Sequence, residues 1–145
     1  MTRVDFYILP EDNRISPLHY AARLVEKAFR RGHQIYIHTR DEEQTRLLSE
    51  QLWQRPQSFL AHDASDCGGP QGQAQKHHRI QVSHQGQPGL HSDVMVNLAG
   101  TIPDFFSRFE RVAEIVPGKP ESRSQSRQNF RFYQERGYAL NSHSI

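Results

Sequence analysis

Histidines are the first residues in this sequence whose type and grouping could support chemistry. The chain has nine of them, and His77, His78, His84 and His91 fall in or near one predicted hairpin, with Cys67 upstream. Imidazole and thiolate groups bind zinc when about four ligands converge. No pair of histidines has the spacing of a His-Glu-x-x-His helix, however, and no Cys-x-x-Cys accompanies them. We therefore expect surface and loop histidines and no metal site.

The sequence also lacks the common phosphate-binding and nucleophilic motifs. The turn after the first predicted strand, Pro10–Arg14, contains no glycine, so its backbone cannot approach a phosphate as a Gly-x-Gly-x-x-Gly loop does. The glycine-rich Gly68–Gly72 is followed neither by Lys and Ser/Thr nor by a clear helix start. Cys67 has no evident fixed base beside it, and no Gly-x-Ser-x-Gly elbow is present. We expect no catalytic residue and no cofactor, which indicates a binding module.

Arginines and an aromatic residue near the C-terminus could bind an acidic peptide. Arg123 and Arg127 are four residues apart on a predicted helix, and Phe130 follows three residues later. A guanidinium pairs with a carboxylate through two parallel hydrogen bonds, and an apolar pocket beside it could hold a ring. The alternative is a solvated helix whose Phe130 and Tyr133 simply pack on a sheet. Spacing alone favours this second interpretation.

Charge is unevenly distributed along the chain. The 145 residues carry a formal net charge of +2, yet residues 111–145 hold six of the 18 Lys/Arg and three of the 16 Asp/Glu. So small a net charge is a poor match to sequence-independent binding of duplex DNA, which requires many phosphates to be neutralised. A local group of arginines fits a smaller acidic partner better. The chain also shows no secretory signal, no apolar run long enough to span a membrane and only one cysteine, so we expect a cytoplasmic protein.

The order of predicted elements indicates an α/β fold. Hydrophobic periodicity and turn residues predict strands at 4–9, 34–39, 58–62, 79–82 and 93–98, and helices at 17–31, 41–55, 103–106 and 122–136. Residues 63–74 are predicted to be an irregular loop, 109–116 either a helix or a strand, and the residues after Leu140 a loose tail. Alternating strands and helices imply right-handed crossovers. We expect a single domain over residues 1–145, a three-layer Rossmann-like fold with a mainly parallel central sheet and helices on both faces.

Three segments resemble a known family, the chi subunit of bacterial DNA polymerase III holoenzyme. They are the strand Val4–Leu9, the motif Leu52-Trp53-Gln54-Arg55-Pro56 followed by Ser58-Phe59-Leu60-Ala61-His62, and the stretch from Ile115-Val116-Pro117 to Gly137-Tyr138. These motifs occur in the order that the family shows, and the resemblance covers nearly the whole chain.

The resemblance implies an accessory protein without catalytic activity. Such a protein forms a heterodimer with the psi subunit, joins the clamp-loader complex through psi, and contacts nucleic acid only indirectly. It also binds the acidic C-terminal tail of single-stranded DNA-binding protein. The resemblance places the tail-binding residues at Val116, Arg123, Arg127, Phe130 and Tyr133, and the psi-binding residues at Phe59 and Trp53. The alternative is a nucleotide- or metal-binding enzyme of similar α/β fold.

Overall fold

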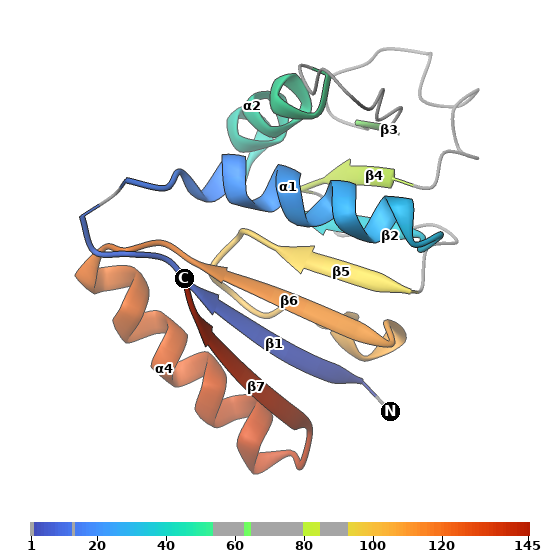
Figure 1. Cartoon of the computed structure of the whole chain (residues 1–145). Helices are drawn as coiled ribbons and strands as arrows, with labels where there is room; N and C mark the ends of the chain where they lie inside the picture. The colour runs from blue at the N-terminus through green and yellow to red at the C-terminus, as the bar shows by residue number, and fades with distance from the viewer. Residues whose placement is uncertain (1, 13, 54–62, 65–79, 85–92) are drawn as a thin grey trace.

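A parallel β-sheet forms the centre of the protein in the computed structural model, which describes residues 2–12, 14–53, 63–64, 80–84 and 93–145. The strands are β1 (Arg3–Ile8), β2 (Ile35–His38), β3 (Asp63–Ala64), β4 (Ile80–Ser83), β5 (Val94–Asn97), β6 (Arg111–Val116) and β7 (Ala139–Ser144). They lie in the order β3-β4-β2-β5-β6-β1-β7, and every neighbouring pair is parallel (Figure 1).

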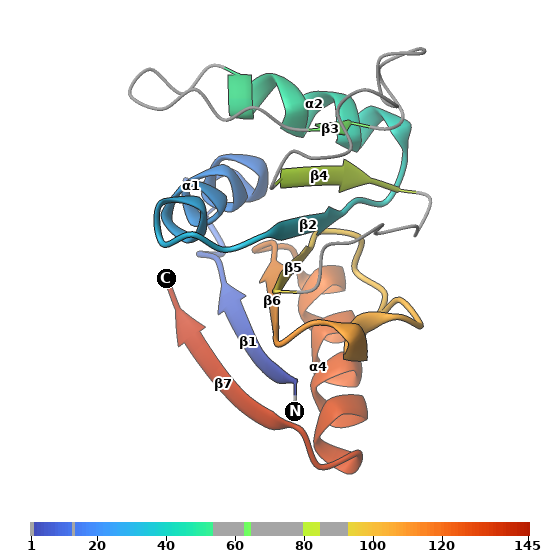
Figure 2. The same ribbon diagram turned by 90° about the vertical axis from the view of Figure 1, so that its right-hand side faces the viewer.

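Helices lie on both faces of this sheet. Helices α1 (Pro17–Arg30) and α2 (Glu42–Trp53) lie on one face, and α4 (Pro120–Glu135) and the 3₁₀ turn η1 (Phe106–Arg108) lie on the other (Figure 2). Each side has its own apolar core, one beneath α1 and α2 and the other beneath α4 and η1. The three-layer α/β fold with a parallel sheet is therefore confirmed.

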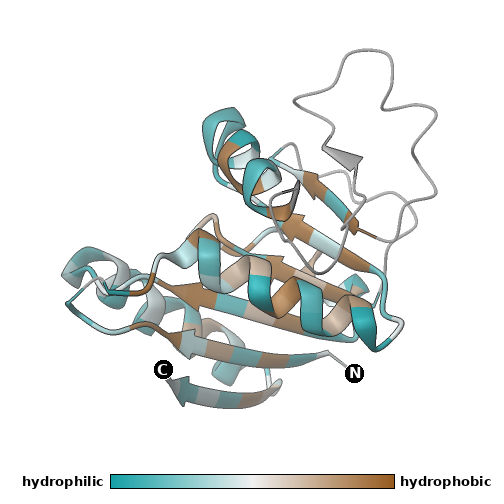
Figure 3. Ribbon diagram, turned by 45° about the horizontal axis from the view of Figure 1, so that its top comes forward, coloured by the Kyte–Doolittle hydropathy of each residue, from teal (hydrophilic) through white to brown (hydrophobic). Residues whose placement is uncertain are grey.

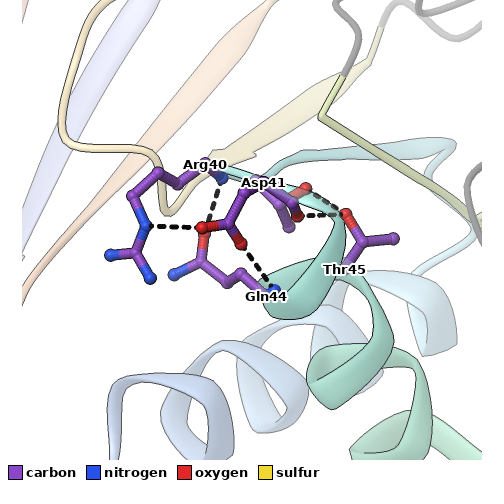
Figure 4. A network of polar contacts seen from close by, with 5 residues as sticks. Arg40, Asp41, Gln44 and Thr45 are labelled. Carbon is purple, nitrogen blue, oxygen red and sulfur yellow. Dashed lines mark hydrogen bonds and ion pairs between the residues drawn. The ribbon is translucent and has the colours of Figure 1, made fainter.

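Local sequence signals explain where the helices begin and end. Ser16 is extended and Pro17 occupies the first turn of α1, while Gly32 ends it with a φ of 88°. At the start of α2 the carboxylate of Asp41 accepts a hydrogen bond from the backbone N–H of Gln44 at 2.8 Å (Figure 4). The Gln44 side chain reaches back to accept from the Arg40 N–H at 2.7 Å. These contacts hold the pKa of the Asp41 carboxyl below its ordinary value, chiefly through the Gln44 N–H and then through Arg40.

Several predicted elements need correction. Asp63 and Ala64, predicted to be in an irregular loop, form β3 beside Gln81 and Val82. The predicted loose tail is the edge strand β7, which pairs in parallel with the full length of β1. The side chains of β7 are mostly exposed, so the strand is held by its backbone pairing with β1. Its sequence therefore has no apolar pattern that would predict a strand.

Residues 109–116 were predicted to form either a helix or a strand, and Arg111–Val116 form strand β6. In place of the short helix predicted at 103–106, the structure has the 3₁₀ turn η1 at Phe106–Arg108. The predicted strand at 58–62 lies outside the described residues. No helix in the described part of the chain is long and apolar enough to cross a membrane.

Candidate functional site

The candidate site lies where the carboxyl ends of β1 and β6 meet the first turns of α4. Ile8 pairs with Val116, and the Leu9 N–H donates to the Val116 carbonyl at 3.0 Å, so both strands end at the same level. Gly118 then passes directly over the chain that leaves β1. A Cβ at Gly118 would lie 2.0 Å from the carbonyl oxygen of Pro10, so only glycine permits this approach. The crossing brings Glu11 beside α4.

Arg123 is held against the end of β1. Its Nη2 donates to the Leu9 carbonyl at 3.5 Å, and its Nη1 lies 3.3 Å from Glu11 Oε1. The Arg123 side chain is 32% exposed and that of Glu11 74%, so this ion pair is solvated and contributes little to folding. The Arg123 Nε is buried and has no hydrogen-bond partner among the described residues. The exposed part of the guanidinium, which faces the weak pair with Glu11, is the part that an anionic ligand can reach.

A cation-lined pocket opens beside Arg123. It has a volume of about 420 Å³ and is lined by Glu11, Gly118, Pro120, Arg123 and Arg127. Arg127 lies one helical turn beyond Arg123 and is exposed, and no acidic group in the described part of the chain pairs with it. The structure therefore brings together the two predicted arginines at the wall of one pocket.

The two apolar candidates lie at the edge of the core beneath α4. Val116 is buried at the end of β6, and Phe130 is half-buried with its ring centroid 5.4 Å from that of Phe6. Phe130 thus packs on the sheet, as the plainer interpretation of this helix expected, and still presents part of its ring to solvent. The two interpretations of the helix are compatible.

Tyr133 occupies a different position from the other four candidates. Its side chain is fully buried, and its hydroxyl donates to Glu114 Oε2 at 2.7 Å. The prediction placed Tyr133 near the binding surface, whereas the structure places it in the core beneath that surface. It can influence a surface site only by holding α4 in position.

The sequence analysis did not single out Glu114, a buried carboxylate in the middle of β6. Its oxygens accept hydrogen bonds from Tyr133 and from Asn97 Nδ2, at 3.2 Å to Oε1 and 3.0 Å to Oε2. Burial raises the pKa of Glu114 to about 7, against the opposing effect of these hydrogen bonds, and burial also raises the pKa of Tyr133. The sequence signal for this buried carboxylate was a glutamate placed between the apolar residues Val112-Ala113 and Ile115-Val116.

Other candidates lie wholly or partly outside the described residues. Phe59 is among them, and Trp53 ends α2 but its side chain is not described. Cys67, His77, His78 and His91 also lie outside the described residues. Within the described ranges, no group of three His, Cys, Asp or Glu side chains could hold a metal ion.

Comparison with known proteins confirms the resemblance found in the sequence. The family model described as DNA polymerase III chi subunit, HolC, matches residues 1–141. The chain is 38% identical to DNA polymerase III subunit chi of Pseudomonas aeruginosa over 148 residues, which cover 100% of this chain and 98% of the relative. The chi subunits of Haemophilus influenzae and Escherichia coli are 29% and 28% identical, over 97% of this chain in each case and 95% and 97% of those relatives. The chain described here is therefore a member of the DNA polymerase III chi subunit family.

Proposed function

We propose that this chain is a noncatalytic replication subunit that binds the acidic C-terminal tail of single-stranded DNA-binding protein. The observation that carries the proposal is the pocket at the start of α4, where Arg123 and Arg127 line the same wall. A tail that ends in aspartates and a phenylalanine offers side-chain carboxylates, a terminal carboxylate and one ring. The arginines pair with the carboxylates, and Val116 and Phe130 border the ring.

The charge of the pocket supports an acidic ligand. Glu11 is the only acid among the described residues that line the pocket, and it is already paired with Arg123. A carboxylate of the tail would replace Glu11 at Arg123 or share the guanidinium with it. Arg127 is available to a second carboxylate without any rearrangement of the described residues.

Titration with a tail peptide tests this proposal. A charge-assisted hydrogen bond contributes about 1.5–3 kcal/mol, so Arg127→Ala should weaken binding by roughly tenfold to a hundredfold. Arg131→Ala is the matched control, because Arg131 is an exposed arginine on the same helix that does not line the pocket. A peptide without its final phenylalanine should bind far more weakly. Equal binding by Arg127→Ala and wild type at low salt would contradict the proposed site.

We further propose that Phe59 and Trp53 contact the psi subunit, through which the chain joins the clamp-loader complex. This assignment is supported by the family and by the motif Leu52–Pro56 with Ser58–His62. Phe59→Ala should weaken psi binding by about 2 kcal/mol or more, as expected for an aromatic hot spot, and leave the melting temperature of the isolated chain unchanged. A melting temperature lowered by several degrees, with psi binding intact, would instead place Phe59 in the core.

An ATP-hydrolysis assay on the purified chain tests the proposal that it is noncatalytic.

A further inference from the structure

A second surface lies on the opposite face of the sheet, where β1 and β7 carry no helix in the described part of the chain. Helix α1 packs over β2 and β6 and leaves the two outer strands open on this side (Figure 2). Parallel sheets are normally covered on both faces by apolar packing. The ribbon of β7, which ends at the C-terminus, is coloured mostly as hydrophilic in Figure 3. Asp5 and Tyr7 of β1 lie in register beside Asn141 and His143 of β7. Such a face suits a polar ligand better than an apolar protein partner.

Cations border this open face. Arg23 and Lys27 are four residues apart on α1 and therefore lie on one side of the helix, Arg31 follows at its C-terminal cap, and all three are exposed. No acidic side chain in the described ranges forms an ion pair with any of them. The nearby acids are already paired: Asp5 with Arg111 at 3.0 Å and His143 at 3.3 Å, and Glu26 with Arg30 at 3.4 Å. The side chain of Asp5 is only 6% exposed, so the accessible charge of the surface is positive.

Two hollows and a row of rings lie between these cations. A hollow of about 100 Å³ between α1 and strands β1 and β6 and one of about 480 Å³ along α1 share Tyr7, Leu24, Lys27 and Arg31 in their linings. The Tyr7 ring stacks on His143, with centroids 4.9 Å apart and an angle of 16° between the rings, and its centroid lies 5.8 Å from that of Tyr20. The surface therefore combines aromatic rings with unpaired cations.

We propose that this surface, bordered by Arg23, Lys27 and Arg31 and containing Tyr7, Tyr20 and His143, binds a short stretch of single-stranded DNA. Cations that follow the phosphates and rings that contact unpaired bases are the two features that single-strand binding requires. Bases in a duplex are stacked on one another and offer no free face to these rings. Three cations are also too few for tight duplex binding. DNA is the polymer with which a DNA polymerase subunit works.

The proposal departs from the sequence-based expectation of indirect contact with nucleic acid. That expectation came from the resemblance to the chi subunit family, and the net charge of +2 argued only against sequence-independent binding of duplex DNA. Folding instead collects Arg23 and Lys27 of α1 and Arg31 at its C-terminal cap, although residues 1–110 carry more Asp/Glu than Lys/Arg. The inference is independent of tail binding, because none of its residues lines the pocket at the start of α4.

Fluorescence anisotropy with a labelled thymidine 12-mer, on the full chain at about 40 mM salt, tests the proposal. The triple variant Arg23→Ala, Lys27→Ala, Arg31→Ala should lose at least tenfold in affinity. The matched control is Arg14→Ala, Arg40→Ala, Arg46→Ala, which removes three arginines that each pair with an acid elsewhere on the surface. Both triple variants have the same net charge, so the control should bind within about twofold of wild type. Both should bind the tail peptide as wild type does.

Salt dependence and a competitor add two further readouts. Three phosphate contacts on a single strand predict a slope of about −2 in log affinity against log salt, or roughly 25-fold weaker binding at 200 mM than at 40 mM. Tyr20→Leu should weaken binding severalfold without changing this slope. The proposal is overturned if wild type does not bind the 12-mer, or if both triple variants lose affinity equally. It is also overturned if a polyglutamate of equal charge binds as tightly as the 12-mer, which would identify an acidic protein as the partner.

Discussion

The contribution of Glu114 to the stability of this protein should decrease as the pH rises from 5 to 8. Its carboxyl is buried between β5, β6 and α4, and burial raises its pKa from an ordinary value of 4.5 to about 7. Between these two values the folded chain binds a proton that the unfolded chain has already released. Folding is therefore favoured on the acid side of this range, and the advantage is lost as the pH rises through 7.

The size of the effect follows from the two pKa values. Each unit of difference corresponds to 1.36 kcal/mol, so the full difference is on the order of 3 kcal/mol. Between pH 5 and pH 8 the contribution of Glu114 should change by roughly 2–3 kcal/mol, which corresponds to roughly 5–10 °C in melting temperature for a chain of this length. Glu114→Gln removes the titration and retains the size of the side chain.

Urea unfolding of wild type and Glu114→Gln at pH 5 and pH 8 measures this contribution. The comparison between the two proteins cancels the titration of other groups, such as His38, whose pKa is lowered by burial and so acts in the opposite direction. The difference in unfolding free energy between Glu114→Gln and wild type should shift by roughly 2–3 kcal/mol in favour of the variant from pH 5 to pH 8.

Tyr133→Phe provides an independent check of the same reasoning. It removes a hydrogen bond of 2.7 Å that stabilises the charged form of Glu114, so it should cost more stability at pH 8 than at pH 5. A pH-independent difference between Glu114→Gln and wild type would refute the assignment. So would an equal cost of Tyr133→Phe at both pH values, because both results would mean that Glu114 keeps an ordinary pKa.

Two further predictions concern the pocket at the start of α4. Glu11→Gln should strengthen binding of the acidic tail peptide by up to about fivefold, because an exposed ion pair of up to about 1 kcal/mol no longer competes for Arg123. Asp12→Asn is the control in the same titration, and a loss of affinity in Glu11→Gln would show that Glu11 positions Arg123 rather than competing for it. Gly118→Ala should lower stability by about 1–3 kcal/mol and weaken peptide binding as well, because its Cβ would displace the Pro10 carbonyl from 2.0 Å. Thermal unfolding measures the first effect, and an unchanged melting temperature would mean that the chain crossing is not tight.

The sequence predicted the elements whose hydrophobic pattern is strong. The strand at Val4–Leu9 and the apolar stripe of the helix that follows Pro17 are both buried as expected. It did not predict β7, because an edge strand with exposed side chains is specified by backbone pairing to β1 and has no periodic apolar residues. The sequence did not predict β3 for a similar reason, because a strand of two residues is too short to show a hydrophobic pattern. These misses occur where the fold depends on contacts distant in sequence.

In the candidate site, too, the sequence predicted what depends on local spacing and did not predict what depends on contacts distant in sequence. Spacing correctly indicated that Arg123 and Arg127 share one side of a helix, because i and i+4 are neighbours on any α-helix. Spacing could not show that Gly118 crosses over Pro10, which brings Glu11 to Arg123 over more than 100 residues of sequence. Spacing also could not distinguish Phe130 from Tyr133, which are three residues apart on the helix. Phe130 is half-buried and reaches the surface, whereas Tyr133 is fully buried and its hydroxyl donates to Glu114.

The two proposed surfaces explain why net charge says little about what this chain binds. The pocket with Arg123 and Arg127 lies at the carboxyl ends of β1 and β6, on the face that α4 covers. Helix α1 starts near that end of the sheet and runs back along the other face, so Arg31 lies close to His33 and Arg111, at the amino ends of β2 and β6. Helices α1 and α4 lie on opposite faces of the sheet (Figure 2), so these cations form two separate groups, and the 16 acidic residues of the chain reduce its formal net charge to +2. An anionic ligand responds to the local field within about a Debye length, roughly 10 Å at 0.1 M salt. Under the two proposals, each group of cations would therefore attract its own partner. A protein arranged in this way can hold an acidic peptide on one face while a strand of DNA lies along the other.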